Sequence, residues 1–201
     1  MDRAAKFKQR THVENNALDR ESGVCAGAAL MWLKQLLEQP AESPEQRIAS
    51  ISDSERWFEM KRMHGEFNTV RHGTYMDRLR IGIPNVCMRQ TGREKTATGR
   101  QGVEELVTFI DETQPSHYAM DFSFDVPAGM NEDDVSTHTC AFYVANNRMR
   151  FFDPNFGEFE VNGNIKSFLL KLHEQYRTYV SRKGVRVDLV IAEMRLIQVA
   201  R

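Results

Sequence analysis

The stretch Gly23-Val24-Cys25-Ala26-Gly27 opens a segment whose apolar residues recur with the period of a helix. The apolar positions that follow are Cys25, Ala28, Ala29, Trp32, Leu33, Leu36 and Leu37. This i, i+3, i+4, i+7 pattern predicts an amphipathic helix that faces the protein core. The helix should end near Gln39-Pro40, because proline cannot continue it. Cys25 is then expected in the first turn, on the buried face.

A cysteine at this position has two interpretations. The partial positive charge at a helix N-terminus favours the thiolate, which is the nucleophilic form of the side chain. The alternative is that Cys25 is a small buried hydrophobe, as most free cysteines are. The position of Cys25 in the helix does not distinguish a nucleophile from a buried hydrophobe. A residue further along the chain that could act as its base would favour the nucleophile.

The composition is that of an ordinary soluble globular protein. The chain has 201 residues, of which 41% are hydrophobic and 27% charged, with a formal net charge of −1. Such a balance gives no reason to expect nucleic acid or an anionic membrane as the main partner. No apolar run is long enough to span a membrane, and the first eight residues lack a signal-peptide core. The three cysteines form neither a disulfide framework nor a CxxC pair, which favours a reducing compartment.

The order of the predicted elements favours a single α+β domain over residues 1–201. Helices are expected in about 1–115 and a mostly antiparallel sheet in about 116–201. In the first part, Ser52-x-x-Glu55 predicts a capping box and Thr91 to Gln101 a polar loop. The remaining predictions are a helix from Val103 to Ile110, strands over 117–124, 137–145, 148–153 and 157–161, a helix over 164–179 and a last strand over 185–199.

Asn146-Asn147 is a plausible two-residue hairpin turn, because asparagine tolerates a positive φ. Counting outward from this turn fixes the strand register. The predicted opposite pairs are Ala145 with Arg148, Val144 with Met149, Phe142 with Phe151, and Cys140 with Asp153. His138 then becomes the diagonal neighbour of Asp153 on the same face, close enough for their side chains to touch.

A carboxylate beside an imidazole fixes its tautomer and stabilises its protonated form. On its own, the pair could be an ordinary surface contact in a hairpin. Together with Cys25, however, His138 and Asp153 supply what thiol catalysis needs: a nucleophile, a base and a group that orients the base.

These residues also carry a family resemblance. Gly23-Val24-Cys25-x-Gly27 with Trp32, then His138, then Phe151-Phe152-Asp153-Pro154-Asn155-Phe156-Gly157-Glu158-Phe159 resemble the YopT-like cysteine proteases. These are papain-like peptidases that bacteria inject into other cells. The resemblance implies a papain-like fold, with a helical lobe that carries Cys25 against a sheet lobe. It also implies Cys25 as nucleophile, His138 as general base and then acid, and Asp153 as the residue that orients His138.

One papain-like feature has no counterpart in the sequence. Papain-like enzymes stabilise the oxyanion with the backbone N–H of the nucleophile and an amide side chain a few residues upstream. Here the residues from Ala17 to Ser22 include no amide. Arg20 or Ser22 could donate instead, and Asn16 lies nine positions before Cys25. The second oxyanion donor is left open.

The resemblance implies an endopeptidase toxin or effector that needs no cofactor and cleaves a protein in a host cell or a competing bacterium. It further implies passage through a bacterial secretion system into the cytosol of the target cell. An immunity protein or a chaperone in the producing cell is a further expected partner. A glutamine deamidase or transglutaminase with the same triad, or a catalytically inert interaction module, are the alternatives. A zinc site on His138 and Cys140 would need two more ligands that the sequence does not offer.

Overall fold

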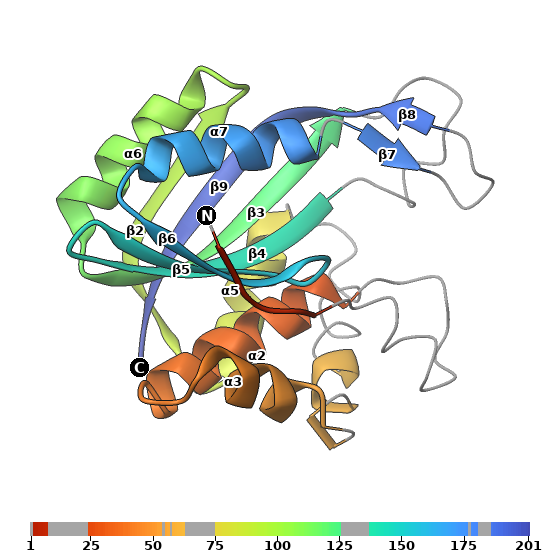
Figure 1. Ribbon diagram of the computed structural model, residues 1–201, viewed down its shortest axis with the longest axis vertical. Helices are drawn as coiled ribbons and strands as arrows, with labels where there is room; N and C mark the ends of the chain where they lie inside the picture. Colours follow the sequence, from red (N-terminus) through yellow and green to blue (C-terminus); the bar gives the residue numbers. More distant parts are fainter. Residues whose placement is uncertain are drawn as a thin grey trace.

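The computed structural model describes residues 2–7, 24–53, 55–56, 58–62, 75–125, 137–176, 178–180 and 186–201. Its centre is a seven-stranded sheet in the order β1-β6-β5-β4-β3-β9-β2 (Figure 1), and all neighbouring strands run antiparallel. The strands are β1 (Asp2–Ala5), β2 (Arg89–Thr98), β3 (Ser116–Asp125), β4 (Thr137–Ala145), β5 (Arg148–Asp153), β6 (Gly157–Asn162) and β9 (Val190–Ala200). A separate two-stranded sheet pairs β7 (Thr178–Val180) with β8 (Arg186–Asp188).

Helices cover both faces of the large sheet. The helices are α2 (Cys25–Glu38), α3 (Pro44–Ile51), α5 (Tyr75–Asn85), α6 (Gly102–Thr113) and α7 (Ile165–Gln175). Figure 1 shows α2, α3 and α5 on one side and α6 and α7 on the other. Each side has its own apolar core: α2 packs with Ala119, Ala141 and Phe152, whereas α6 and α7 pack with the opposite face of β3 and β4. The predicted α+β class with a helix-borne cysteine packed on an antiparallel sheet is therefore confirmed.

The hairpin between β4 and β5 has the predicted register. Asn146 and Asn147 both adopt positive φ angles, 51° and 59°, as a two-residue turn requires. The observed pairs run from Ala145 opposite Arg148 to Ala141 opposite Phe152. Turn and alternation are local properties, so the sequence could determine this register.

The predicted loop over Thr91–Gln101 is wrong, because β2 forms there as an edge strand. β2 pairs with β9 on one side only, and most of its side chains are exposed. A strand exposed on both faces lacks the apolar alternation by which buried strands are recognised.

The predicted capping box at Ser52 is also wrong. The Ser52 hydroxyl donates to the carbonyl of Ile48, and Asp53 accepts from the Glu55 N–H instead. A capping box does form at the start of α3, where Ser43 and Gln46 bond to each other's backbone N–H. The same Ser-x-x-Glu/Gln spacing thus occurs at both ends of α3, and only its first occurrence caps a helix.

The C-terminal elements are shorter than predicted. α7 ends at Gln175, and Tyr179 of the predicted helix lies in β7. The predicted strand over 185–199 is divided into β8 and β9 around Leu189, because β8 pairs with β7 rather than joining the large sheet. Among the described helices, none is long and apolar enough to cross a membrane.

Candidate active site

Cys25 is the first residue of α2, as predicted. Its side chain is buried, and the helix begins with a hydrogen bond from the Ala28 N–H to the Val24 carbonyl, 2.9 Å long. Within this helix no side chain caps the N-terminus, and the first turn contains no acidic residue. The positive end of the helix dipole is therefore not neutralised by a side chain of α2 itself, which favours an anion at this position.

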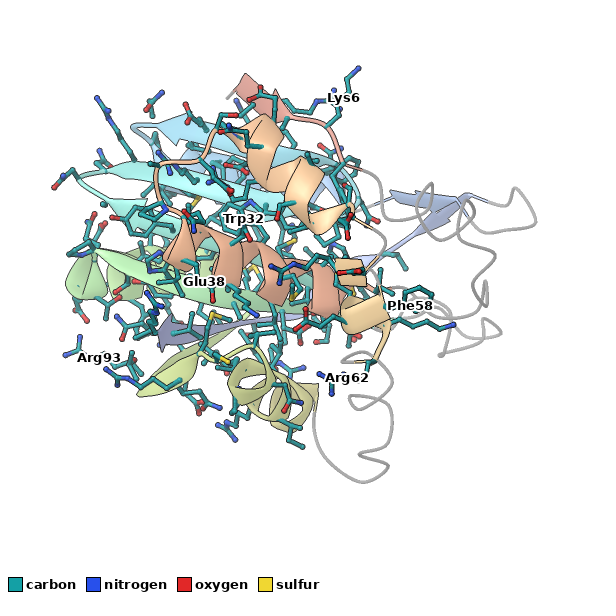
Figure 2. All side chains as sticks on the ribbon, turned by 90° about the horizontal axis from the view of Figure 1, so that it is seen from below. Lys6, Trp32, Glu38, Phe58, Arg62 and Arg93 are labelled. Atoms are coloured by element: carbon teal, nitrogen blue, oxygen red, sulfur yellow. The ribbon has the colours of Figure 1, made fainter. Side chains whose placement is uncertain are left out.

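Gly27 allows the backbone of residue 60 to approach this helix closely. A Cβ at position 27 would lie 2.6 Å from the carbonyl oxygen of Met60, a distance that carbon atoms do not tolerate. The glycine two residues after the cysteine is thus required by packing, because only glycine leaves room for that carbonyl. Trp32, further along the same helix, lies at the centre of the molecule, whereas Lys6, Phe58 and Arg93 are exposed (Figure 2).

His138 and Asp153 are in contact, as the hairpin register predicted. The imidazole Nε2 lies 3.1 Å from Asp153 Oδ1, and both side chains are buried. Asp153 is held from two further directions: its Oδ1 accepts from the Asn155 N–H at 2.8 Å, and its Oδ2 accepts from the Tyr176 hydroxyl at 2.5 Å. Both carboxylate oxygens are therefore engaged, and the orientation of the carboxylate is fixed.

This environment favours the protonated imidazole. Burial alone would lower the pKa of His138, but the Cys140 sulfur and the Asp153 carboxylate outweigh it and raise the pKa well above its ordinary value. Because Nε2 faces Asp153, Nδ1 is the nitrogen left to exchange a proton with a thiol. The arrangement can thus hold an imidazolium at position 138.

Tyr176 is a site residue that the sequence did not reveal. It lies within the segment 164–179 that is predicted as a helix; in the structure its hydroxyl donates to Asp153 and its ring lies 5.0 Å from that of His138. The Phe122 ring is parallel to that of His138, with the two ring centroids 6.5 Å apart. These rings exclude water from the pair and so strengthen its electrostatic interaction.

Asp121 is a second residue that the sequence did not reveal. It lies on β3, is fully buried, and its carboxylate oxygens have no hydrogen-bond partner within the part of the chain that the structure describes. Arg195 Nη2 is 3.7 Å from Oδ2, too far for a hydrogen bond. Burial raises the pKa of Asp121 well above its ordinary value, and the charges of Cys25 and His138 both act on it. Its signal in the sequence is a single acid between Met120 and Phe122 in an apolar strand.

His138, Cys140 and Asp153 also form the only group of potential metal ligands found within the described ranges, with their ligand atoms within 4.8 Å of one another. This donor set fits a metal poorly. Burial raises the pKa of the Cys140 thiol, which opposes the thiolate that a metal requires, and both Asp153 oxygens already accept hydrogen bonds. Cys140 is a buried core residue beside the pair, as predicted.

One hollow among the described residues lies away from Cys25. It measures about 710 Å³ and is lined by the end of α2 and the β4–β5 hairpin, with Leu37, His117 and Tyr143 among its walls. Cys25 begins α2, so this hollow is at the opposite end of the helix. The upstream segment that would supply a second oxyanion donor, Asn16 to Ser22, lies outside the described residues.

A cysteine at the N-terminus of a helix, packed on an antiparallel sheet that carries a His–Asp pair, defines a papain-like cysteine peptidase architecture. A family profile described as Yersinia/Haemophilus virulence surface antigen, peptidase family C58, matches residues 76–191. The chain belongs to this YopT-like family of papain-like proteases, which confirms the resemblance read from the sequence.

The fold is similar to that of a solved bacterial protein. The crystal structure of the Pseudomonas avirulence protein AvrPphB superposes with a TM-score of 0.65 at 18% identity, over 97% of each chain. A cysteine protease-like domain of the Photorhabdus asymbiotica toxin PaTox gives a TM-score of 0.46 at 13% identity, over 94% of this chain and 53% of the other. A search among curated proteins gave no match.

The profile match includes His138 and Asp153 but begins after Cys25. The role of Cys25 thus depends on its own position in the sequence and the structure. Membership of the family makes the chain a cysteine protease-like effector.

Proposed function

We propose that this protein is a cysteine endopeptidase in which Cys25 is the nucleophile, His138 the general base and acid, and Asp153 the residue that orients His138. The observation that carries the proposal is the His138–Asp153 hydrogen bond, made by a carboxylate that Asn155 and Tyr176 also hold. The position of Cys25 as the first residue of α2 supports the thiolate form, because the positive end of the helix dipole stabilises an anion there.

The reaction follows from these groups. The Cys25 thiolate attacks the carbonyl carbon of a peptide bond, and the oxyanion that forms accepts hydrogen bonds from backbone N–H groups at the start of α2. The proton on His138 passes to the leaving nitrogen, the C–N bond breaks and a thioester remains. His138 then takes a proton from water, whose oxygen attacks the thioester; the C–S bond breaks, the carboxylic acid is released, and the Cys25 thiolate and the protonated His138 are restored.

Family membership supports a protein substrate in another cell, reached through a bacterial secretion system, because the family profile describes virulence antigens. An immunity protein or a chaperone in the producing cell belongs to the same proposal. Residues 1–201 are treated as one domain, and the large sheet supports this because it takes β1 from the start of the chain and β9 from its end.

Proteome-wide mass spectrometry of new N-termini tests the reaction. Host and bacterial lysates are treated with the wild-type protein, with Cys25→Ala, or with Cys87→Ser. Cys87 is exposed and free, so its replacement is the matched control that should leave activity unchanged. New N-termini that require Cys25 and survive Cys87→Ser are the expected result, and they identify the substrate.

The other outcomes separate the alternatives. Glutamines converted to glutamates in a Cys25-dependent manner, without new N-termini, would replace the peptidase by a deamidase. New glutamine–amine linkages would indicate a transglutaminase. A biological effect that persists in Cys25→Ala would show that the protein acts by binding.

A further inference from the structure

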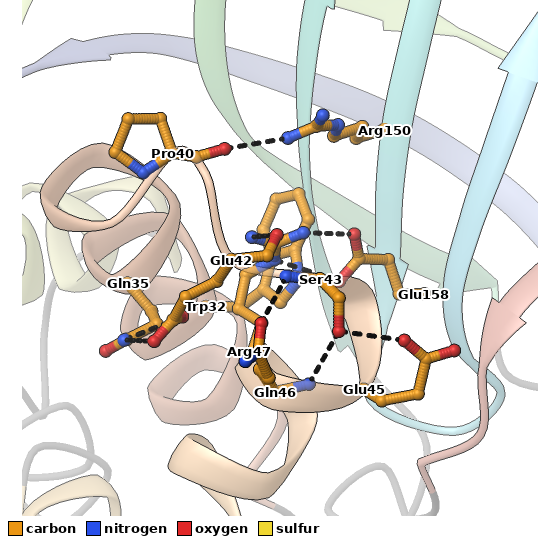
Figure 3. A network of polar contacts seen from close by, with 10 residues as sticks. All are labelled: Trp32, Gln35, Pro40, Glu42, Ser43, Glu45, Gln46, Arg47, Arg150 and Glu158. Atoms are coloured by element: carbon orange, nitrogen blue, oxygen red, sulfur yellow. Dashed lines mark hydrogen bonds and ion pairs between the residues drawn. The ribbon is translucent and has the colours of Figure 1, made fainter.

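A fully buried ion pair lies beside the proposed active site, between α3 and β6. Glu158 accepts two hydrogen bonds from the Arg47 guanidinium, from Nε to Oε2 at 3.1 Å and from Nη2 to Oε1 at 2.9 Å. Trp32 Nε1 donates a third, also to Oε2, at 2.7 Å. All three side chains have zero solvent exposure, and Figure 3 shows them together with the neighbouring contacts of α3. We refer to Trp32, Arg47 and Glu158 as the Glu158 cluster.

The cluster is connected to both halves of the proposed catalytic machinery. Trp32 lies on α2 seven residues after Cys25, about 10 Å further along the helix. Its ring stacks on that of Phe152, with centroids 5.6 Å apart and planes inclined by 9°. Phe152 immediately precedes Asp153 and is the cross-strand partner of Glu158. Trp32 therefore joins α2 to both strands of the β5–β6 pair, through its hydrogen bond to Glu158 on β6 and its stacking on Phe152 of β5, which ends at Asp153.

Directional bonds fix relative position in a way that apolar contacts do not. The Arg47 guanidinium also lies over the Trp32 ring, 5.9 Å from its centroid, and donates through Nη1 to the Glu42 carbonyl at 3.1 Å. The guanidinium is thus held on several sides, and its planar fork sets the direction of the Glu158 carboxylate. A buried ion pair is seldom more stabilising than well-packed apolar residues of similar volume, so stability alone does not account for it.

We propose that Glu158 is a positioning residue, which through Trp32 and Arg47 holds Cys25 on α2 at a fixed distance from the His138–Asp153 pair. This proposal rests on the proposed function, because it assumes a thiolate–imidazolium pair between Cys25 and His138. It assigns a role to the glutamate of the Asp153-Pro-Asn-Phe-Gly-Glu158 run that the catalytic triad itself does not supply.

The test measures Cys25 directly, without a substrate. In a Cys87→Ser background, the rate of alkylation of Cys25 by iodoacetamide is recorded from pH 4 to pH 10, and mass spectrometry of the Cys25 and Cys140 peptides separates the two remaining thiols, which are both buried. The wild-type background should react at low pH, because His138 stabilises the thiolate well below the free-thiol pKa of about 8.5. The main variant replaces the whole cluster with apolar residues of similar size: Trp32→Phe, Arg47→Met and Glu158→Leu.

This triple variant should remain about as stable to urea as the background, because the three buried polar side chains are removed together and the Glu42 carbonyl, which loses its bond from Arg47, is only partly buried and can accept from water. Its alkylation at pH 6 should nevertheless fall at least tenfold and its profile move toward that of a free thiol, because the thiolate and the imidazole are no longer held in register. A triple variant with the background's pH profile would overturn the proposal, since the cluster would then be dispensable for positioning.

Two further variants keep the test decisive. If the triple variant does not fold, Glu158→Gln keeps the size and an acceptor oxygen for Trp32 but removes the charge that faces Arg47, and Arg47→Lys keeps the charge but loses the fork. Both should lower the pH 6 rate in their folded state, and unchanged profiles in both would overturn the proposal.

His138→Ala separates the failure of this proposal from the failure of the proposed function. That variant should lose the low-pH reactivity altogether. If the background itself titrates as an ordinary thiol and His138→Ala changes nothing, the thiolate–imidazolium pair is absent. The proposed function then fails, and the role of Glu158 fails with it.

Discussion

The His138 imidazole and the Asp153 carboxylate meet across a hairpin, with Nε2 3.1 Å from Oδ1. The carboxylate can be a fixed orienter because it accepts from Asn155 on its own turn and from Tyr176 just beyond α7. Three segments of the chain therefore converge on one side chain. This convergence makes the His138–Asp153 pair a candidate for catalysis rather than an incidental surface contact.

Asp153→Ala should lower turnover by about 10²–10⁴-fold while the fold persists, because the imidazole loses its orientation. It should also move the alkaline limb of the pH–rate profile to lower pH. Asp153 is one of the groups that raise the pKa of His138, whereas burial lowers it. The kcat/KM on the identified substrate and the circular dichroism spectrum check this result. Full activity would refute a role for the hairpin register in catalysis.

Tyr176→Phe should reduce kcat about three- to tenfold, because one charge-assisted hydrogen bond to Asp153 is lost while the ring contacts with His138 remain. Tyr143→Phe is the matched control, since the Tyr143 ring contacts that of His117, with centroids 4.5 Å apart, near the other end of β4. Comparison of the two kcat values checks the prediction. Equal activities would show that the Asn155 N–H suffices to hold the carboxylate.

Asp121→Asn should stabilise the protein at pH 8 more than at pH 4. Burial raises the pKa of Asp121 in the folded state above its unfolded value of about 3.9, so the folded protein binds more protons from about pH 4 upward. Stability is therefore lost as the pH rises through this window, and asparagine, which does not ionise, removes that loss. Urea unfolding at pH 4, 6 and 8 measures the difference. A gain that is independent of pH would show that the folded carboxyl titrates normally.

Gly157→Ala should destabilise the fold by at least about 2 kcal/mol, because φ is +109° and a Cβ would meet the backbone of β1 at Ala5 and the residues after it. Gly163→Ala is the control: φ is +93°, but a Cβ there would meet nothing within 4 Å. Strain alone should cost the control about 1 kcal/mol. Thermal unfolding of both variants checks the difference, which would vanish if β1 could move away from the turn after Asp153.

Local chemistry is what the sequence by itself determined. The apolar period from Cys25 predicts α2, and Asn146-Asn147 predicts the turn that pairs β4 with β5. Turn type and alternation fix register over a few residues, so the contact between His138 and Asp153 follows from counting. The same reasoning failed for β2, whose strand character depends on pairing with the distant β9.

Only the tertiary structure decided which distant groups complete the site. Tyr176 donates to Asp153, Asp121 is buried 3.7 Å from Arg195 Nη2, and Glu158 binds Arg47 in α3. None of these contacts leaves a periodic trace in the sequence, because each joins residues that are far apart along the chain. A buried polar or charged side chain must find a partner inside the protein, because it cannot bond to water. The packing of helices on both faces of the sheet determines which side chain that partner is.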